Sequence, residues 1–322
     1  IRAAKPKRKT RSATLGGGFP TAAEKAGRTP PPPLTGARQY FAGGGVDDVP
    51  GPPPPLLSLP ASPLGARYYL PLARALAAEG VDVAITELRG QGESTHRIGR
   101  GGVAGYHESA AEDVPLALDA MRRALGDRRV ILLGHSMGAQ IGVYHLARRD
   151  PRVAGLVAVA AQSPFHRGFP RPVGRKLRFG SVVLPVVGRL AGHVPGGFFG
   201  AEGRLPADRV RDWSRLAATG VMQPARADLD YLAGLTRVEV PVLSVVIAHD
   251  PLAPESAARG LLAMLPGART SLEVEPVPLG HNTWARTPAA VVARVLAWMD
   301  REVPVSPSRD DDEGDDAGRT RR

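Results

Sequence analysis

The stretch Arg129-Val-Ile-Leu-Leu-Gly-His-Ser-Met-Gly-Ala-Gln140 decides the fold that we predict for this chain. Val130 to Leu133 is an unbroken apolar run, which is typical of a strand buried on both faces. The segment from Ala139 onward returns to helical composition. Between the two, a Gly-x-Ser-x-Gly turn carries Ser136 at its apex. Strand, tight turn and helix together are the context of a nucleophile elbow.

The chemistry of such an elbow requires its two glycines. The backbone at the serine is strained, and side chains at Gly134 and Gly138 would collide with the neighbouring strand and helix. The helix that follows Ser136 also points backbone N–H groups at the place where an oxyanion would form. In a chain with 38 glycines the pentapeptide alone can arise by chance, so partner residues must decide its meaning.

The size and composition of the chain narrow the class of protein. Its 322 residues suffice for one large α/β domain with tails, and 43% hydrophobic with 23% charged residues are ordinary for a globular protein. No apolar run is long enough for a membrane span. The chain has no cysteine, which excludes disulfides, thiolate metal sites and a cysteine nucleophile and fits a cytoplasmic location. Nothing implies a metal or an organic cofactor.

The net charge of +11 is compatible with nucleic-acid binding, but the distribution of the charged residues along the chain does not support it. The aromatic content is only 5%, without the basic–aromatic alternation expected for base stacking. A basic run at residues 5–11 could bind nucleic acid or an anionic surface, although a solvated tail is favoured. We therefore expect no nucleic-acid partner.

The order of apolar segments predicts a doubly wound α/β fold with a mainly parallel sheet. Residues 1–54 are Pro-, Gly- and Arg-rich and are expected to be a disordered or atypical segment without strands. The core is expected at 55–162 and 237–303, with an acidic disordered tail at 304–322. In the first core part we predict strands at 56–59, 81–86 and 153–160 and helices at 66–79 and 113–125, the latter capped by Asp113.

Residues 163–236 interrupt this alternation and are rich in Arg, Pro, Gly and aromatic residues. Helices are expected at 182–190 and 208–218. An insertion between two sheet strands would cover the strand ends as a lid. The alternative is a surface excursion with no role in substrate binding.

Two later residues could activate Ser136. Asp250 lies just past the apolar strand at 241–248, and His281 lies just past the strand expected at 270–277. A histidine base must take the serine proton, and a carboxylate must orient the imidazole. The order Ser, Asp, His, each at a strand end, is that of α/β-hydrolases.

At these residues the chain resembles the α/β-hydrolase superfamily, in particular a bacterial branch of predicted α/β-fold serine hydrolases whose substrates are mostly undefined. The resemblance covers about residues 56 to 301. It is carried by Leu59-Pro-Ala-Ser-Pro-Leu-Gly-Ala-Arg-Tyr-Tyr69, Glu87-Leu-Arg-Gly-Gln-Gly-Glu-Ser94, Leu133-Gly-His-Ser-Met-Gly138, Arg211-Asp-Trp213, His249-Asp-Pro251 and Leu279-Gly-His281. His249 and Pro63 stand where the superfamily usually has glycine.

The resemblance implies roles for individual residues. Ser136 would be the nucleophile, His281 the general base and Asp250 its orienting carboxylate. The Met137 N–H would be one oxyanion donor, and Ala61 or Ser62 would supply the second. His135 is interpreted as the variable position of the elbow. The other histidines lack metal-ligand spacing and are expected to be structural or surface residues: His96, His107, His145, His166 and His193.

The sequence thus predicts a serine hydrolase that cleaves an ester or related acyl bond of a small, partly apolar substrate through an acyl-enzyme. Two alternatives stay open. The same acyl-enzyme could pass its acyl group to an alcohol or amine, which would make the protein an acyltransferase. The chain could also be a non-catalytic α/β-hydrolase scaffold that binds a ligand or partner.

Overall fold

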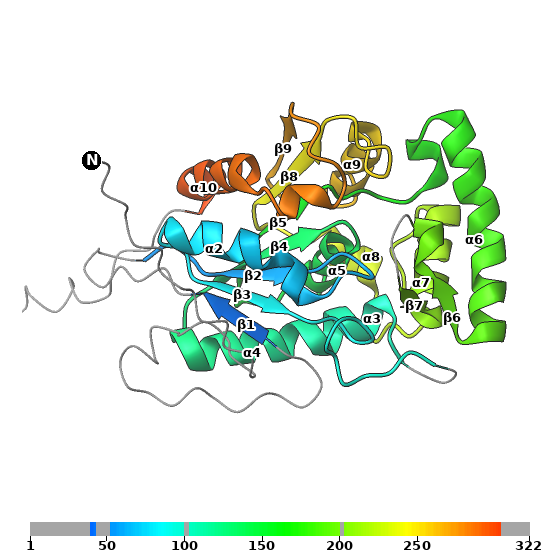
Figure 1. Ribbon diagram of the computed structural model, residues 1–322, viewed down its shortest axis with the longest axis horizontal. Coiled ribbons are helices and arrows are strands. Elements are labelled where there is room, and N and C mark those ends of the chain that lie inside the picture. The colour runs from blue at the N-terminus through cyan, green and yellow to red at the C-terminus, as the bar shows by residue number, and fades with distance from the viewer. Residues whose placement is uncertain (1–38, 43–51, 100–102, 200–202, 304–322) are drawn as a thin grey trace, which may run out of the picture.

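The computed structural model describes residues 39–42, 52–99, 103–199 and 203–303. Most of the two expected tails, 1–54 and 304–322, therefore lies outside the described residues. The described chain alternates strands and helices around one central sheet (Figure 1). None of its helices is long and apolar enough to cross a bilayer.

The central sheet has seven strands in the order β1-β3-β2-β4-β5-β8-β9. All neighbouring strands pair in parallel except β1, which is antiparallel to β3. The predicted mainly parallel, doubly wound α/β fold is confirmed. The strands are β1 (Gln39–Ala42), β2 (Leu56–Leu59), β3 (Val83–Thr86), β4 (Val130–His135), β5 (Val153–Val159), β8 (Val242–Ile247) and β9 (Thr270–Glu275).

Strand β1 corrects the expectation that residues 1–54 contain no strand. It extends the sheet beyond β3, with Gln39 opposite Thr86 and Ala42 opposite Val83. A four-residue edge strand is too short to display an alternating pattern, and its backbone pairing with β3 does not require one. The sequence therefore carries no local signal for it.

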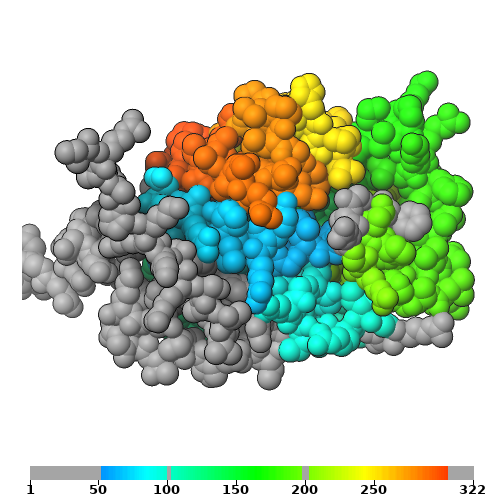
Figure 2. Space-filling model, viewed as in Figure 1, coloured from blue at the N-terminus to red at the C-terminus, as the bar shows by residue number. Residues whose placement is uncertain are grey.

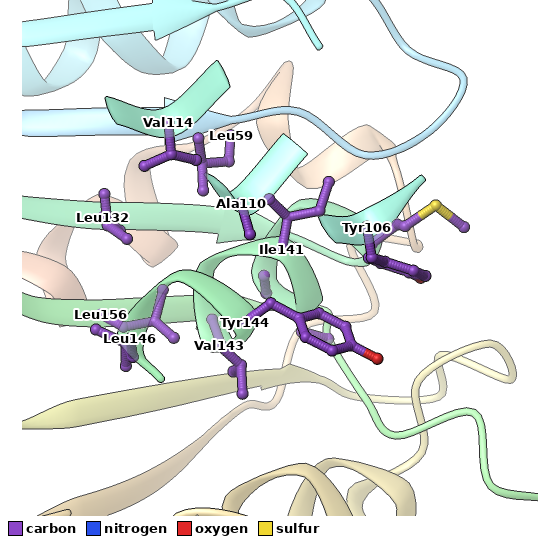
Figure 3. Packing of buried hydrophobic residues seen from close by; sticks show 14 of the residues in the cluster. Leu59, Tyr106, Ala110, Val114, Leu132, Ile141, Val143, Tyr144, Leu146 and Leu156 are labelled. Atoms are coloured by element: carbon purple, nitrogen blue, oxygen red, sulfur yellow. The ribbon is translucent and has the colours of Figure 1, made fainter. Parts of the chain in front are cut away.

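Helices cover both faces of the sheet, because apolar side chains of the central strands point alternately to either side. Leu57, Leu59 and Leu132 pack against one set of helices, whereas Leu56 and Ile131 pack against the other. The first set includes α4 (Val114–Leu125) and α5 (Met137–Leu146), and Figure 3 shows their apolar side chains meeting the strands. The second includes α2 (Leu70–Ala78, after a 3-10 turn at Ala66–Tyr69) and α10 (Ala289–Glu302).

Two helices frame the β8–β9 region and the site. Helix α9 (Glu255–Leu262) follows β8, and a 3-10 turn at Thr283–Ala285 follows β9 and precedes α10. Both strand ends therefore pass directly into short connections. This arrangement places Asp250 and His281 in loops that leave the same edge of the sheet.

The insertion between β5 and β8 forms its own layer at the end of the sheet to which the parallel strands point (Figure 1). It contains a 3-10 turn at His166–Gly168, α6 (Arg171–Ala191), the hairpin of β6 (His193–Pro195) and β7 (Arg204–Pro206), a 3-10 turn at Gly196–Phe199, α7 (Ala207–Thr219) and α8 (Tyr231–Leu235). Helix α6 is twice as long as the helix expected at 182–190, because it packs along α7 despite its glycines and Pro185.

Helical backbone in front of α4 also begins earlier than predicted. It starts at α3 (Tyr106–Glu108) and continues through a π-helical turn at Ser109–Asp113. The expectation that Asp113 is the N-cap was wrong, since it has helical dihedral angles and makes no capping bond. Its carboxylate instead accepts hydrogen bonds from two guanidinium nitrogens of Arg89, Nε and Nη2. Both side chains are about 95% buried.

Loss of Asp113 should therefore destabilise the fold. In an Asp113→Ala variant the buried Arg89 cation keeps only the exposed Glu112 as an acidic partner. Leaving one member of a buried ion pair without its partner typically costs about 3 kcal/mol. We expect a decrease of that size in the free energy of unfolding, measured by urea denaturation. The matched control is Glu255→Ala, which removes the exposed pair with Arg259 and should cost less than about 0.5 kcal/mol; equal losses in the two variants would contradict the argument.

Candidate active site

The turn between β4 and α5 has the strained geometry of an elbow. Ser136 has φ 51° and ψ −115°, a region that residues with side chains rarely adopt. A Cβ on Gly134 would lie 2.3 Å from the Cα of Ala139, and one on Gly138 would lie 2.1 Å from the Leu59 carbonyl oxygen. Only glycine fits at either position, as the sequence predicted, so the strand, the helix and the end of β2 can approach closely around Ser136.

The structure brings Ser136, His281 and Asp250 together. The Ser136 Oγ lies 3.0 Å from His281 Nε2, and His281 Nδ1 lies 2.7 Å from Asp250 Oδ2. Each residue follows a parallel strand, namely β4, β9 and β8, so all three meet at one edge of the sheet. A hydroxyl, an imidazole and a carboxylate in this order allow the proton of the serine to move to the histidine.

Asp250 is fixed by its own loop. Its Oδ1 accepts the backbone N–H of Leu252 at 2.9 Å, which leaves Oδ2 for the histidine, and the side chain is fully buried. The preceding residue, His249, has φ 59°. This positive φ explains why glycine is usual at that position in the superfamily that the chain resembles; histidine is among the residues that tolerate the left-handed region.

The two expected sources of the second oxyanion donor differ in the structure. The Ala61 N–H is already donated to the Tyr69 hydroxyl at 2.8 Å in a buried position. No such bond holds the N–H of Ser62 among the described residues. Met137 is the first residue of α5, where backbone N–H groups have no partner within the helix. Its N–H and that of Ser62 are therefore the pair left for an oxyanion.

Comparison with known proteins bears on the fold of the chain. The family model described as alpha/beta hydrolase fold matches residues 54–174, which contain β2, the elbow and β5. The chain has the α/β-hydrolase fold. A search of curated protein sequences finds no match.

Several solved structures of α/β-hydrolases are similar along most of the chain. A structure of DcsB in complex with its substrate analogue has a TM-score of 0.60 and 17% identity, covering 83% of this chain and 94% of that one. A structure reported with the metagenome-derived lipolytic enzymes LipS and LipT has a TM-score of 0.57 and 16% identity, covering 84% and 100%. A thermophilic esterase from Thermogutta terrifontis has a TM-score of 0.52 and 18% identity, covering 82% and 93%. At these identities the likeness concerns the fold.

The segment at residues 61–64 follows β2 and carries the predicted second oxyanion donor, so we call it the oxyanion segment. It is held in place by Gln91 and Arg209. The Gln91 amide donates to the carbonyls of Ala61 and Leu64 at 3.1 and 2.9 Å. Its Oε1 accepts from Arg209 at 2.6 Å and from the Ser62 hydroxyl. Arg209 belongs to α7 and is fully buried, so a cation from the insertion supports the segment that leaves β2. Burial lowers the pKa of the Arg209 guanidinium to about 10.

A chain of hydrogen bonds also joins the oxyanion segment to the loop of the base. The Tyr69 hydroxyl, which accepts from Ala61, lies 2.7 Å from His135 Nδ1, and His135 Nε2 lies 2.9 Å from the His281 carbonyl oxygen. The carbonyl can only accept, so His135 must carry its proton on Nε2. Nδ1 is then the acceptor for the tyrosine proton. Each of the three donors in this series, the Ala61 N–H, the Tyr69 hydroxyl and His135 Nε2, therefore has one acceptor.

Both side chains in this hydrogen-bonded chain are neutral. Burial raises the pKa of the Tyr69 hydroxyl far above its ordinary value. Burial, followed by the nearby His281, lowers the pKa of His135 well below 6.5. His135, predicted to be the variable position of the elbow, is fully buried and packs edge-on against Trp284.

Sequence reasoning did not predict the hydrogen bonds that four residues make beside the triad: Tyr69, Gln91, His135 and Arg209. Only His135 gave a local signal, a polar residue at the end of an apolar strand. The described residues contain no cluster of acidic or histidine side chains that could hold a metal. His145 is buried on α5, where its Nδ1 donates to the Ala110 carbonyl oxygen at 2.8 Å, whereas His96 is exposed.

Removal of the Tyr69 hydroxyl should destabilise the protein. In Tyr69→Phe the Ala61 N–H and His135 Nδ1 both lose a buried partner, and each unsatisfied group costs about 1–3 kcal/mol. We expect a loss of about 2–4 kcal/mol in the free energy of unfolding, measured by urea denaturation. Tyr68→Phe is the matched control, because the neighbouring ring keeps its contact with Arg286. A Tyr69→Phe protein as stable as the Tyr68→Phe protein would show that the hydroxyl does not hold these groups.

The neutral His135 should make the fold sensitive to acid. The folded protein keeps this group unprotonated, whereas the unfolded chain takes up a proton below about pH 6.5, so stability falls as the pH decreases through that value. Between pH 6.5 and 5 the contribution is up to about 2 kcal/mol. Urea denaturation at several pH values should show a shallower decline for His135→Asn than for wild type. The exposed His96→Asn is the control, and identical slopes in wild type and His135→Asn would refute the assignment.

Proposed function

We propose that this protein is a serine hydrolase that cleaves a carboxylic ester or related acyl bond through an acyl-enzyme on Ser136. The observation that carries the proposal is the unbroken contact from the Ser136 Oγ to His281 Nε2 and from His281 Nδ1 to the buried Asp250. A serine hydroxyl is a weak nucleophile until a base accepts its proton. The positive φ at Ser136 adds a second argument, since such strain persists where it serves a function.

In the proposed first step, the Ser136 Oγ attacks the carbonyl carbon of the substrate, and its proton moves to His281 Nε2. Asp250 stabilises the imidazolium through the bond to Nδ1. The negative charge on the former carbonyl oxygen would be met by the N–H groups of Met137 and Ser62. The tetrahedral intermediate then expels the leaving group, which takes the proton from His281, and an acyl-enzyme remains.

In the second step a water molecule loses a proton to His281 and attacks the acyl carbon. Collapse of this intermediate releases the carboxylic acid and returns the proton to Ser136. An alcohol or amine in place of water would complete an acyl transfer with the same groups. We place hydrolysis first because similar structures are described as an esterase and as lipolytic enzymes.

We extend the proposal to the insertion at 163–236, which would cover the strand ends as a lid. This role is supported by its position beyond the C-terminal ends of the parallel strands and by the buried Arg209 beneath the oxyanion segment. Arg209 anchors the insertion to Gln91, which also binds the segment that follows β2. Its apolar and aromatic composition favours a small, partly apolar acyl substrate.

The triad assignment predicts that replacement of Ser136 or His281 abolishes reaction with acyl compounds. In Ser136→Ala the nucleophile is absent, and in His281→Ala the serine keeps its proton. We expect wild type to be labelled by a fluorophosphonate and to release p-nitrophenol from short-chain p-nitrophenyl esters. Both variants should lose at least about 10³-fold in kcat/KM and should not be labelled.

The control is Ser256→Ala, which removes an exposed hydroxyl on α9 and should leave labelling unchanged. Circular dichroism and thermal unfolding would establish that all variants are folded. A folded wild-type protein that resists the fluorophosphonate would overturn the hydrolase proposal and favour the non-catalytic scaffold. Ester turnover that persists in Ser136→Ala would place the nucleophile elsewhere.

A further inference from the structure

Helix α6 is the outermost element of the insertion. Figure 1 shows it at the end of the molecule farthest from β1 and β3, with α7 and the β6–β7 hairpin between it and the sheet. Figure 2 shows the same green segment exposed at the molecular surface. The face of α6 that points away from α7 is thus accessible to a binding partner.

The buried and exposed faces of α6 have different characters. Small residues and one leucine form the buried face: Gly174, Ser181, Leu184 and Gly188. On the opposite face Phe179 is 71% exposed, Val182 59% and Val186 55%. These three lie at the i, i+3 and i+7 spacing that aligns side chains along one stripe of a helix. A contiguous exposed apolar stripe of this kind is uncommon on a protein surface unless it binds something.

The stripe lies in a strongly cationic segment. Residues 163–199 contain six Arg or Lys residues and no Asp or Glu: Arg167, Arg171, Arg175, Lys176, Arg178 and Arg189. None of the six forms a salt bridge with a residue in the described part of the chain. Arginines in other parts of the described chain are paired, as Arg148 is with Asp228 and Arg226 with Glu108. Five of the six lie on α6, so this helix carries positive charge that no acidic side chain of residues 163–199 balances.

A cleft of about 810 Å³ opens beside the apolar stripe. Phe169, Phe179 and Val182 contribute apolar walls, while Arg171, Arg175 and Arg178 surround it with guanidinium groups. Guanidinium groups bind phosphate oxygens with two parallel hydrogen bonds. The combination of apolar and cationic lining residues suits an amphiphile with an anionic head.

We propose that α6 docks this protein on the surface of a bilayer that contains anionic phospholipids. Phe179, Val182 and Val186 enter the boundary between headgroups and acyl chains, and the flanking arginines contact lipid phosphates. Cationic amphipathic helices bind membranes in this orientation, parallel to the surface. The absence of any acidic side chain in 163–199 argues for an anionic lipid surface as the occupant. The binding does not involve Ser136, so the Ser136→Ala protein should dock equally well.

The cysteine-free chain permits a direct test with a single fluorescent probe. The full-length Val182→Cys variant is labelled with an environment-sensitive dye and mixed with vesicles of phosphatidylcholine containing 30% phosphatidylglycerol. A blue shift is expected with these vesicles and not with pure phosphatidylcholine. It should weaken at least about tenfold in apparent affinity as salt rises from 50 to 300 mM, because salt screens the charges. Leu116→Cys on the distant α4 is the probe control and should show no shift.

Vesicle co-sedimentation of two charge-matched variants tests the arginines. The triple variant Arg171→Gln/Arg175→Gln/Arg178→Gln should bind the anionic vesicles at least about tenfold more weakly than wild type. The control Arg123→Gln/Arg149→Gln/Arg237→Gln removes the same charge from exposed positions elsewhere and should bind as wild type does. Thermal unfolding would verify that both triples are folded.

Three results would overturn the proposal. Equal weakening in the two triple variants would attribute binding to overall charge. Vesicle binding without a blue shift at position 182 would assign it to another segment, such as the basic run at residues 5–11. A blue shift with poly-glutamate but not with vesicles would favour an acidic protein partner.

Discussion

The close approach of backbone segments around the elbow is the constraint on which the rest of this site depends. At Gly138 the distance to the Leu59 carbonyl leaves no room for even one methyl group. The absence of side chains at Gly134 and Gly138 lets α5 start directly beside the end of β2. The Met137 N–H and the segment that contains Ser62 consequently border the same space, and Ser136 is held in a strained conformation facing His281.

The parts of the site that could be predicted from sequence are those that local patterns express. Two glycines between an apolar run and a helical segment indicate the position of Ser136. Asp250 and His281 each follow a segment that the pattern predicts to be a strand. Because the strands are parallel, the loops that follow them lie at the same edge of the sheet, and no additional sequence signal is needed to predict this. The mainly parallel sheet was predictable for the same reason, because buried strands and amphipathic helices alternate along the chain.

The remaining features depend on contacts between segments that are distant in the sequence, so no local sequence pattern predicts them. Tyr69 meets His135 across 66 residues, and Arg209 meets Gln91 across 118. A buried arginine in a polar stretch looks like any surface arginine until its partner is known. Helix α6 was underestimated because its glycines and Pro185 lower helix propensity, whereas packing along α7 stabilises it.

The wide separation of the triad along the chain has a consequence for biosynthesis. Ser136 lies on a central strand, but His281 lies 145 residues later, after the strand β9 at the edge of the sheet. A polypeptide emerging from the ribosome therefore presents the serine long before any imidazole can deprotonate it. Under the proposed mechanism, Ser136 therefore has no base during translation of the insertion and β8. Under that mechanism, the newly made chain gains a base for Ser136 only when the loop after β9, the last described strand, joins the sheet.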